Sequence, residues 1–543
     1  MLSFLEQLRT FVNDSEVIAD TLSRPGGLAR LIADYLVQFM HNPLVAWVVT
    51  LLVFAAIAAS TACLLRRRTG SWLLAPLSLF PIAALYYLQL NMNYLYAGTV
   101  AMLLMLILLN IQVVIDNKYG RWIYSLLSTV LLFMLAGSIS TLYVVLVLVI
   151  EASRSIKRLH TYLVLPLLLF VMAWLYLRCG LAGTWQHLLL PHGYFTWRLQ
   201  PGSVVYMPWV LMGIVCMIGE LSGCLKLKKS WIKSLLVVVQ LAGWGVFVWF
   251  SHPQYVDKHN EAFKQISQSL YNGQWQEVIA QYQTLPAGNL IYQNCLNTAL
   301  AEEGRLADCL FLQPCFGIQS IYIQGNKTPY ISALLSDIYF SMGHIAFSQR
   351  YAFEANESLG NYSPRLLKLL VQTNLIYGEY GVAKKYLTLL GKTRYYKQWA
   401  KEHERFLWND QAVESDSLLG MKRRCLFPDN RMSGSKGLDD DLKQIIRQNP
   451  SHSATIQYLG SLYLLSKDLT RFMEVMQEFY ATEALPAKLP VAFQEAVLMA
   501  AEADESLIAH YAIDESNVKR YADFKQNPTK YPRTFWYYLK YAK

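Results

Sequence analysis

Acidic side chains are nearly absent from one long stretch of the chain. Between residues 43 and 251 they are Asp116, Glu151 and Glu220, while long apolar runs dominate. From residue 254 to residue 543, acidic and basic residues are mixed at the density of a soluble protein. Of the 543 residues, 54% are hydrophobic and 16% are charged, a balance typical of membrane proteins rather than globular ones. The chain therefore has two physically different halves.

Several sequence motifs that mark catalytic, nucleotide-binding or metal-binding sites are also absent. The sequence has no nucleotide-binding loop, hydrolase elbow, HExxH pair or dinucleotide fingerprint, so soluble enzyme classes have little support. The eight cysteines include no CxxC and no zinc-ligand spacing, and we expect neither a metal nor another cofactor. Cys295, Cys309, Cys315 and Cys425 lie in the distal half, where an oxidising compartment would allow them to pair; the sequence leaves that open.

The apolar runs predict membrane-spanning helices. A span needs roughly 20 apolar residues, because the helix must bond all of its own backbone groups inside the bilayer. A seventh stretch, 121–151, is too long for one span and short for two; with Gly137 and Ser138 in its middle, it predicts a tight hairpin of two short helices. Together these segments predict about eight spans. The six runs that reach or approach the required length are 43–64, 71–90, 97–115, 161–178, 205–224 and 231–250.

Basic clusters between the runs predict the orientation, because Lys and Arg are retained on the cytoplasmic side. This pattern explains the net charge of +10 without a nucleic-acid partner. Eight spans with these clusters inside place both residues 1–42 and residues 251–543 outside. The clusters are Arg66, Arg67 and Arg68; Lys118 and Arg121; Arg154, Lys157 and Arg158; and Lys226, Lys228, Lys229 and Lys233.

The leading segment, 1–42, has no signal peptide and carries Arg9, Arg24 and Arg30, which are awkward to export. Either it is translocated as an N-tail or an upstream span precedes it, and we favour the second interpretation. After Pro25, apolar residues recur at helical spacing, so the segment predicts an amphipathic helix. That helix either lies on the outer membrane surface or packs against the bundle, with equal support for both. Its apolar face consists of Leu28, Leu31, Ile32, Tyr35, Leu36, Phe39 and Met40.

Strongly polar chemistry is scarce inside the spans and concentrated in one outer loop. Their interiors offer only Asn110, Gln112 and Gln240, which argues against a proton-coupled transporter or pump. Aromatic residues at an interface usually anchor there, and that reading of the loop is favoured. The sharper hypothesis is a lipid-phosphate or headgroup site in which Arg198 donates to the phosphate and a histidine transfers protons. The residues of this loop are Trp185, His187, His192, Tyr194, Trp197 and Arg198.

Glycines recur in the distal half, each followed by an apolar or aromatic residue and then a small one. They are Gly273, Gly304, Gly343 and Gly378, spaced roughly 34 residues apart as in tetratricopeptide arrays. A glycine at a sharp turn between two helices, with a small residue for close packing, resembles the tetratricopeptide repeat. The resemblance covers 256–390 and more weakly 440–510, where Lys467 stands in the glycine's place. It breaks at 400–440, a segment with two charge runs that we expect to be a solvated loop.

The whole arrangement resembles an uncharacterised family of bacterial polytopic inner-membrane proteins. We expect an all-α chain: a surface segment (1–42), a transmembrane bundle (43–250) and a tetratricopeptide-like α-solenoid in the periplasm (251–543). Solenoids of this kind bind proteins or peptides, so the resemblance implies an envelope scaffold whose partners are envelope proteins and membrane lipids. The alternative is a multi-span glycosyltransferase using a polyprenyl-phosphate sugar. In that hypothesis Glu6 or Asp14 acts as the base and Arg198 holds the lipid phosphate.

Overall fold

The computed structural model describes residues 3–180, 183–196, 199–222, 229–256, 258–286, 288–428 and 437–542. This described part is all-α, as predicted, and its β pairing is limited to isolated bridges such as that between Tyr94 and Phe195. The chain forms two compact units. Unit 1 consists of residues 1–261 together with the short segments 362–364 and 392–397, and unit 2 consists of the remainder.

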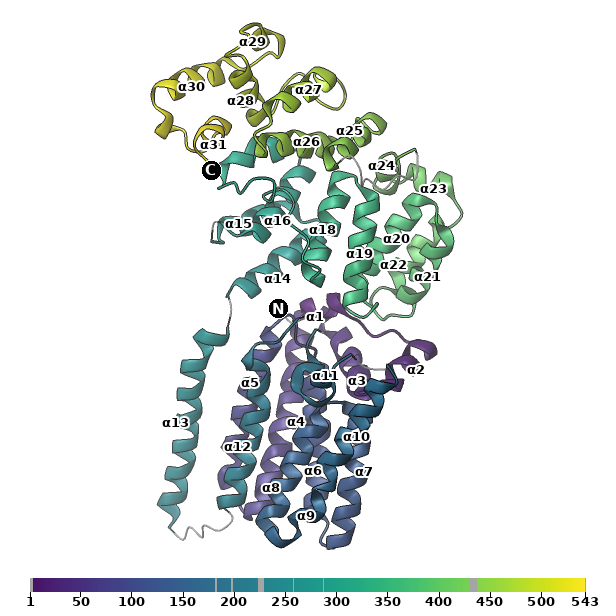
Figure 1. Cartoon of the computed structure of the whole chain (residues 1–543), viewed down its shortest axis with the longest axis vertical. Coiled ribbons are helices and arrows are strands. Elements are labelled where there is room, and N and C mark those ends of the chain that lie inside the picture. The colour runs from purple at the N-terminus through teal and green to yellow at the C-terminus, as the bar shows by residue number, and fades with distance from the viewer. Residues whose placement is uncertain are drawn as a thin grey trace. The chain divides into compact units, whose positions relative to one another are not determined.

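Unit 1 is a bundle of long helices preceded by three short ones (Figure 1). Its α-helices are α1 (Ser3–Leu8), α2 (Ser15–Ser23), α3 (Gly27–Val37), α4 (Pro43–Thr69), α5 (Leu79–Leu90), α6 (Ala97–Val114), α7 (Lys118–Ala136), α8 (Ile139–Arg154), α9 (Leu159–Tyr162), α10 (Val164–Arg178), α11 (Trp185–Leu189), α12 (Met207–Ser222) and α13 (Ser230–Tyr255). Its 3-10 helices are η1 (Gln38–His41), η2 (Trp72–Ser78), η3 (Ile156–Arg158), η4 (Pro191–Tyr194) and η5 (Ser203–Tyr206).

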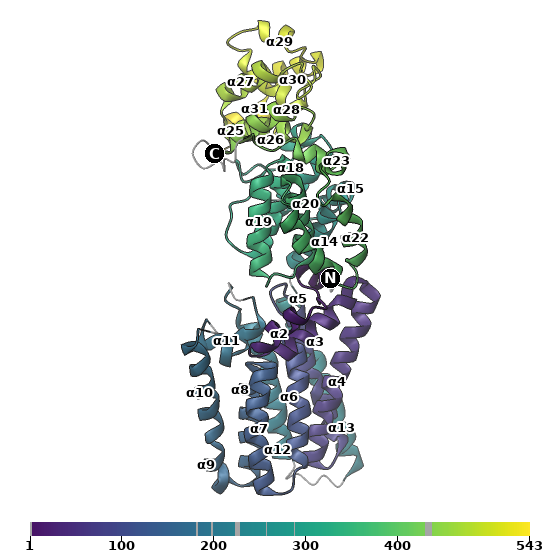
Figure 2. The same ribbon diagram turned by 90° about the vertical axis from the view of Figure 1, so that its right-hand side faces the viewer.

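Seven helical segments in the described residues are long and apolar enough to cross a membrane, so the chain is a multi-pass membrane protein. They are α4, η2 with α5, α6, α7, η3 with α9 and α10, η5 with α12, and α13. The predicted hairpin is confirmed as two helices, α7 and α8, which meet at Gly137 and Ser138; α8 has 16 residues. In the turned view, α4, α6, α7 and α8 again run side by side (Figure 2).

The amphipathic helix α3 packs against α6 and α7. Its buried stripe is Ala29, Ala33 and Val37, whereas the expected apolar face of larger residues is only partly covered, and Tyr35 is exposed. Small residues allow α3 to approach the bundle closely. The corner before it is held by a backbone bond from Gly26 N–H to Met134 O of 2.9 Å, beside Gly137. Of the two alternatives from the sequence, packing against the bundle is the one observed.

Unit 2 consists of shorter helices that follow one another in pairs. Its α-helices are α14 (Lys258–Tyr271), α15 (Trp275–Gln283), α16 (Leu290–Glu302), α17 (Leu306–Cys309), α18 (Pro329–Met342), α19 (Ile345–Ser358), α20 (Pro364–Tyr377), α21 (Tyr380–Gly391), α22 (Lys397–His403), α23 (Asp410–Ser415), α24 (Leu419–Arg423), α25 (Leu438–Gln448), α26 (Ser453–Leu465), α27 (Leu469–Phe479), α28 (Val491–Ala500), α29 (Ser506–His510), α30 (Glu515–Gln526) and α31 (Phe535–Tyr541). Its 3-10 helices are η6 (Leu310–Leu312), η7 (Glu404–Phe406) and η8 (Pro528–Lys530).

Five of these pairs share one turn. In each, a residue one or two positions after the end of the first helix has a positive φ. These residues are Gly273, Gly304, Gly343, Gly378 and Lys467. At Gly343, the N–H of the turn residue donates to Phe340 O and the next N–H, of His344, donates to Tyr339 O, which is the Schellman arrangement. The other four turns repeat both bonds. The four glycines therefore lie at turns between helices, and Lys467 occupies the left-handed conformation that a glycine adopts more easily.

The described part of the segment 400–440 is not the solvated loop expected from its charges. It contains α22, α23 and α24, and Lys422 is only 1% exposed. The Lys422 ammonium donates to Phe340 O at 2.7 Å and approaches His452 Nε2 at 2.8 Å, so it caps the end of α18. Burial lowers the pKa of both Lys422 and His452. The sequence reading was wrong because a charge run does not reveal which of its members reach helix ends.

The four distal cysteines are free thiols in the structure. Cys295 and Cys425 are buried, and Cys309 and Cys315 are partly exposed. Burial raises the pKa of the Cys295 and Cys315 thiols to about 12, which leaves them unreactive near neutral pH. The described cysteines therefore form no disulfide in the structure, and Cys295 and Cys315 are not activated nucleophiles.

Candidate functional site

The loop between α10 and α12 holds the predicted aromatic and histidine residues, of which Trp197 and Arg198 lie outside the described residues. Trp185 stacks on Phe170, with ring centroids 4.9 Å apart. His187 Nδ1 lies 2.6 Å from Thr184 Oγ1, and His192 Nε2 lies 2.7 Å from Tyr206 OH. The two imidazole centroids are 6.4 Å apart. The structure thus brings the histidines together, with a hydroxyl partner for each.

Tyr194 serves a different purpose from its neighbours in this loop. It is buried, its hydroxyl donates to Ala136 O, and it accepts from Ile139 N–H at 3.0 Å. A Cβ added at Gly98 would lie 2.9 Å from the Tyr194 side chain, so α6 passes close beneath it. Tyr194 therefore holds the turn between α7 and α8, and its hydroxyl is committed to the backbone.

Asp14 is a helix cap. Its carboxylate accepts from Glu16 N–H and Val17 N–H at the start of α2 and forms an ion pair with Lys392 of unit 1. The hydrogen bond from Lys392 holds the pKa of Asp14 below its ordinary value. Each carboxylate oxygen thus has a partner, which is the surroundings of a structural acid.

Glu6 lies in different surroundings. It is buried on α1, and its Oε2 accepts a hydrogen bond of 2.7 Å from Tyr396 OH, another residue of unit 1. His41 Nδ1 lies 3.5 Å from the same oxygen. The other oxygen, Oε1, is buried without a hydrogen-bond partner in the described part. A carboxylate with a free oxygen beside an imidazole is an arrangement suited to proton transfer.

His41 was missed by the sequence reasoning. It lies at the end of η1, two residues before α4, where the pattern showed only the close of an amphipathic segment. No spacing rule connects position 41 to position 6, because the chain between them turns through α2 and α3. Only its place at the start of the first span could have marked it as an interface residue.

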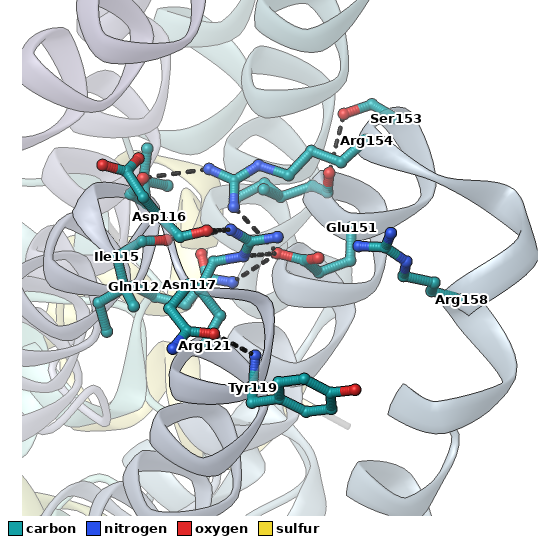
Figure 3. Close-up of polar contacts among 12 residues, drawn as sticks. Gln112, Ile115, Asp116, Asn117, Tyr119, Arg121, Glu151, Ser153, Arg154 and Arg158 are labelled. Carbon is teal, nitrogen blue, oxygen red and sulfur yellow. Dashed lines mark hydrogen bonds and ion pairs between the residues drawn. The ribbon is translucent and has the colours of Figure 1, made fainter.

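The opposite end of the bundle contains a buried ion-pair network (Figure 3). Glu151 Oε1 accepts from Arg121 Nε at 3.1 Å, Arg154 Nη1 at 3.2 Å and Gln112 Nε2 at 3.0 Å. The two guanidinium groups also donate to backbone carbonyls at the end of α6: Arg121 to Ile115 O and Asp116 O, and Arg154 to Val113 O. One acid therefore joins α6, α7 and α8.

A second acid extends this network to α4 and α12. Glu220 accepts from Arg68 at 2.5 and 2.6 Å, and from Ser153 Oγ at 2.5 Å. The sequence placed Glu151 and Glu220 at span ends and read the basic clusters as topological signals. It did not show that members of three clusters, Arg68, Arg121 and Arg154, are bound to these two acids.

Among the described residues, no group of three or more His, Cys, Asp or Glu side chains could hold a metal ion. One protein-family model, described as a family of unknown function (DUF6057), matches residues 1–542. No curated protein and no solved structure matches the chain. Function is therefore inferred from three features: the end of the bundle with Glu6 and His41, the end with Glu151 and Glu220, and the helix pairs of unit 2.

Proposed function

The chain belongs to the DUF6057 family of unknown function, and from its geometry we propose that it is an envelope scaffold. The bundle anchors the protein in the cytoplasmic membrane of a bacterial cell. Unit 2 presents helix pairs to proteins or peptides outside that membrane. The observation that carries this proposal is the repeated turn: five helix pairs in unit 2 with the same Schellman geometry.

Repetition matters because a pair of short helices cannot bury its apolar face alone. Stacked pairs bury a continuous core and expose an extended surface, which is how helical-repeat arrays bind peptides. Two pairs in unit 2 pack closely, α18 with α19 and α26 with α27, and α16 packs on α18, the next long helix along the chain. A tetratricopeptide-like array accounts for this packing better than an enzyme fold.

The interior of the bundle supports an anchoring role. Asn110 Nδ2 donates to Ser60 O and Leu106 O, and Gln240 Nε2 donates to Leu73 O and Leu236 O. These amides join neighbouring helices instead of lining a path. Glu151, Arg121 and Arg154, drawn in Figure 3, lie at one end of the bundle and are paired with one another. Within the described residues, the spans therefore carry none of the spaced ionisable groups of an ion pathway.

The orientation rests on two supports. The described basic residues Arg68, Arg121 and Arg154 gather at one end of the bundle, which the positive-inside rule places in the cytoplasm. Segment 392–397 also contacts the N-terminal segment, as in the 2.9 Å bond from Asn13 N–H to Lys392 O. Contact requires both segments to be on one side of the membrane, in agreement with an even number of crossings between them.

The test is site-specific photo-crosslinking of the full-length protein in its own cells. A photoreactive residue at Phe353 or Trp408, both exposed in unit 2, should give defined protein adducts, identified by mass spectrometry. The matched control is Trp249, an exposed aromatic on the apolar span α13, which should give lipid adducts only. The scaffold proposal is wrong if a scan of exposed unit 2 positions captures no protein.

Glu6 favours a second candidate, the polyprenyl-phosphate glycosyltransferase, because its Oε1 is buried and lacks a hydrogen-bond partner in the described part. In this proposal Glu6 is the base and His41 positions it. Purified protein would then contain a lipid-linked sugar, and Glu6→Gln would abolish transfer while Asp14→Asn would not. An unchanged cellular glycan profile in the Glu6→Gln strain would eliminate the candidate.

A further inference from the structure

The level of the membrane surface can be read from the first span. α4 begins at Pro43, capped by a 2.9 Å bond from Leu44 N–H to Asn42 Oδ1. Directly after this cap, Leu44, Trp47 and Leu51 are 76%, 61% and 69% exposed. A continuous apolar strip of this kind faces lipid tails and not water. The residues just before Pro43 therefore lie at the headgroup layer.

Three aromatic contacts mark that level. The ring of Tyr395 stacks on His41, with centroids 4.7 Å apart and an interplanar angle of 17°. The guanidinium of Arg394 lies over the ring of Phe39, 5.1 Å from its centroid, and 5.9 Å from that of Tyr395. All four residues belong to unit 1. The stacks hold Arg394 and Tyr395 against Phe39 and His41, which precede the first residue of the span, Pro43, in the chain.

These contacts leave the guanidinium of Arg394 able to donate hydrogen bonds to a ligand. A guanidinium lying over an aromatic face keeps its N–H edge directed outward, where it can donate two parallel hydrogen bonds. Its neighbour Lys392 is paired with Asp14, but Arg394 is exposed and has no carboxylate partner within the described ranges. Lys397, also exposed, adds a further positive charge to the segment.

We propose that Arg394, with His41 and Tyr395 beside it, binds the phosphate of an anionic membrane lipid at the outer end of α4. Arg394 supplies the bidentate donor, which matches a phosphate better than a point charge does. Tyr395, which is stacked on the imidazole and is 38% exposed, supplies the amphipathic ring that suits the headgroup layer. The adjacent lipid-facing strip of α4 receives the acyl chains, which is why the ligand is a lipid and not a free anion.

The experiment uses the full-length protein in detergent, titrated with phosphatidylglycerol or with phosphatidylcholine, and counts bound lipids by native mass spectrometry. Arg394→Gln should weaken phosphatidylglycerol binding by about tenfold, the worth of one charge-assisted bidentate contact. Arg394→Lys, which keeps the charge and loses the fork, should fall between this variant and the parent. The control is Arg350→Gln, because Arg350 also lies over the ring of the next residue, Tyr351, at 5.8 Å, but on α19 of unit 2.

The outcomes separate the alternatives. The site is supported if Arg394→Gln loses affinity for phosphatidylglycerol but not for phosphatidylcholine, while Arg350→Gln binds phosphatidylglycerol as well as the parent does. Equal phosphatidylglycerol binding in Arg394→Gln and the parent overturns it. Displacement of the bound lipid by excess inorganic phosphate would show a site for a small anion and overturn the assignment to a lipid, whereas retention supports it. If Arg394→Gln does not fold, Arg394→Lys decides the question by the same comparison.

Discussion

The two units bury charged side chains in different places. In unit 1, Glu151 and Glu220 lie together at one end of the helices with the arginines that bind them. In unit 2, buried charges are distributed through the core: Lys422 caps α18, Glu495 receives the first N–H of α31, and Asp337 pairs with Arg365. Burial raises the pKa of Asp337 despite the neighbouring guanidinium.

The difference follows from the surrounding solvent. A charged side chain in the middle of a membrane span is not solvated by water, which is costly. The acids and arginines of the unit 1 spans therefore lie at the span ends and pair with one another there. The helices of unit 2 are short, and each leaves carbonyl and N–H groups without partners inside the helix. Buried Lys and Glu side chains satisfy those groups. Glu151 and Glu220 therefore join helices in unit 1, whereas Lys422 and Glu495 cap helices in unit 2.

The largest effect should follow from removing the acid that joins α6, α7 and α8. Glu151→Ala leaves Arg121, Arg154 and Gln112 without their shared acceptor, and we expect a loss of about 3–5 kcal/mol, as for other broken buried pairs. Thermal unfolding in detergent measures it. Asp116→Asn is the control, since Asp116 is an exposed acid at the same end, and its variant should unfold like the parent. Equal losses in both variants would contradict the network.

The second-largest effect should be a dependence of the stability of unit 2 on pH. Glu495 is buried, accepts from Phe535 N–H at 2.7 Å and lies 3.5 Å from Arg520; burial raises its pKa to about 7 from the ordinary 4.5. Between these values the folded state keeps a proton that the unfolded state loses. The contribution of Glu495 to stability is therefore complete below pH 4.5 and is lost as pH rises to 7, with a slope of about 1.4 kcal/mol per pH unit.

Glu495→Gln tests this slope, because the amide still accepts from Phe535 N–H and does not titrate. Urea unfolding followed by the fluorescence of a tryptophan in this region, such as Trp536, should show the slope in the parent and its absence in the variant. Identical slopes in the two proteins would assign the dependence to another group.

Substitution of two turn glycines should have a smaller effect on stability, and each variant serves as the control for the other. Gly343 and Gly378 both have positive φ, so alanine at either should cost about 1–2 kcal/mol from the backbone. A Cβ at Gly343 would also meet Cys425 Sγ at 3.2 Å and Ile445 Cγ2 at 3.3 Å, while at Gly378 the nearest atom is Arg423 Nη2 at 3.7 Å. Gly343→Ala should be the less stable of the two by about 1 kcal/mol or more in chemical denaturation. The reverse order would contradict the close packing around Gly343.

The smallest effect concerns the turn without a glycine. Lys467 has φ +60° and also holds the C-terminal helix α31 through Ala542 O and the ring of Tyr538. Lys467→Met removes these contacts and keeps the strained backbone, whereas Lys467→Gly removes both. We expect the glycine variant to be more stable than the methionine variant by about 1 kcal/mol. Equal stabilities would show that the left-handed turn costs nothing here.

Local pattern predicted much of the fold. The apolar runs predicted the spans, and Gly137 and Ser138 divided the longest run correctly, because spacing and turn residues act within a few positions. The same reasoning placed all four turn glycines and recognised Lys467 as the substitute for a fifth. Helix ends were less accurate: α4 continues to Thr69 and α13 to Tyr255, beyond the apolar cores that were predicted.

Contacts between distant positions could not be predicted. Lys422 reaches the end of α18, about eighty positions earlier in the chain, and Glu6 meets His41 only after the chain has turned through two helices. The buried stripe of α3 was also missed, since hydrophobicity favoured Leu28 and Ile32 over the small residues Ala29 and Ala33 that allow close packing. Such choices depend on the partner surface and not on the segment itself.

The orientation on which the scaffold proposal depends can be measured directly. Single cysteines are introduced as Lys519→Cys, on an exposed position of unit 2, and Asp116→Cys, at the end of the bundle shown in Figure 3, in a background without native cysteines. A membrane-impermeant maleimide is then added to intact right-side-out vesicles. The scaffold account predicts labelling at position 519 and none at 116 until the vesicles are opened; labelling at 116 alone would place unit 2 inside and contradict it.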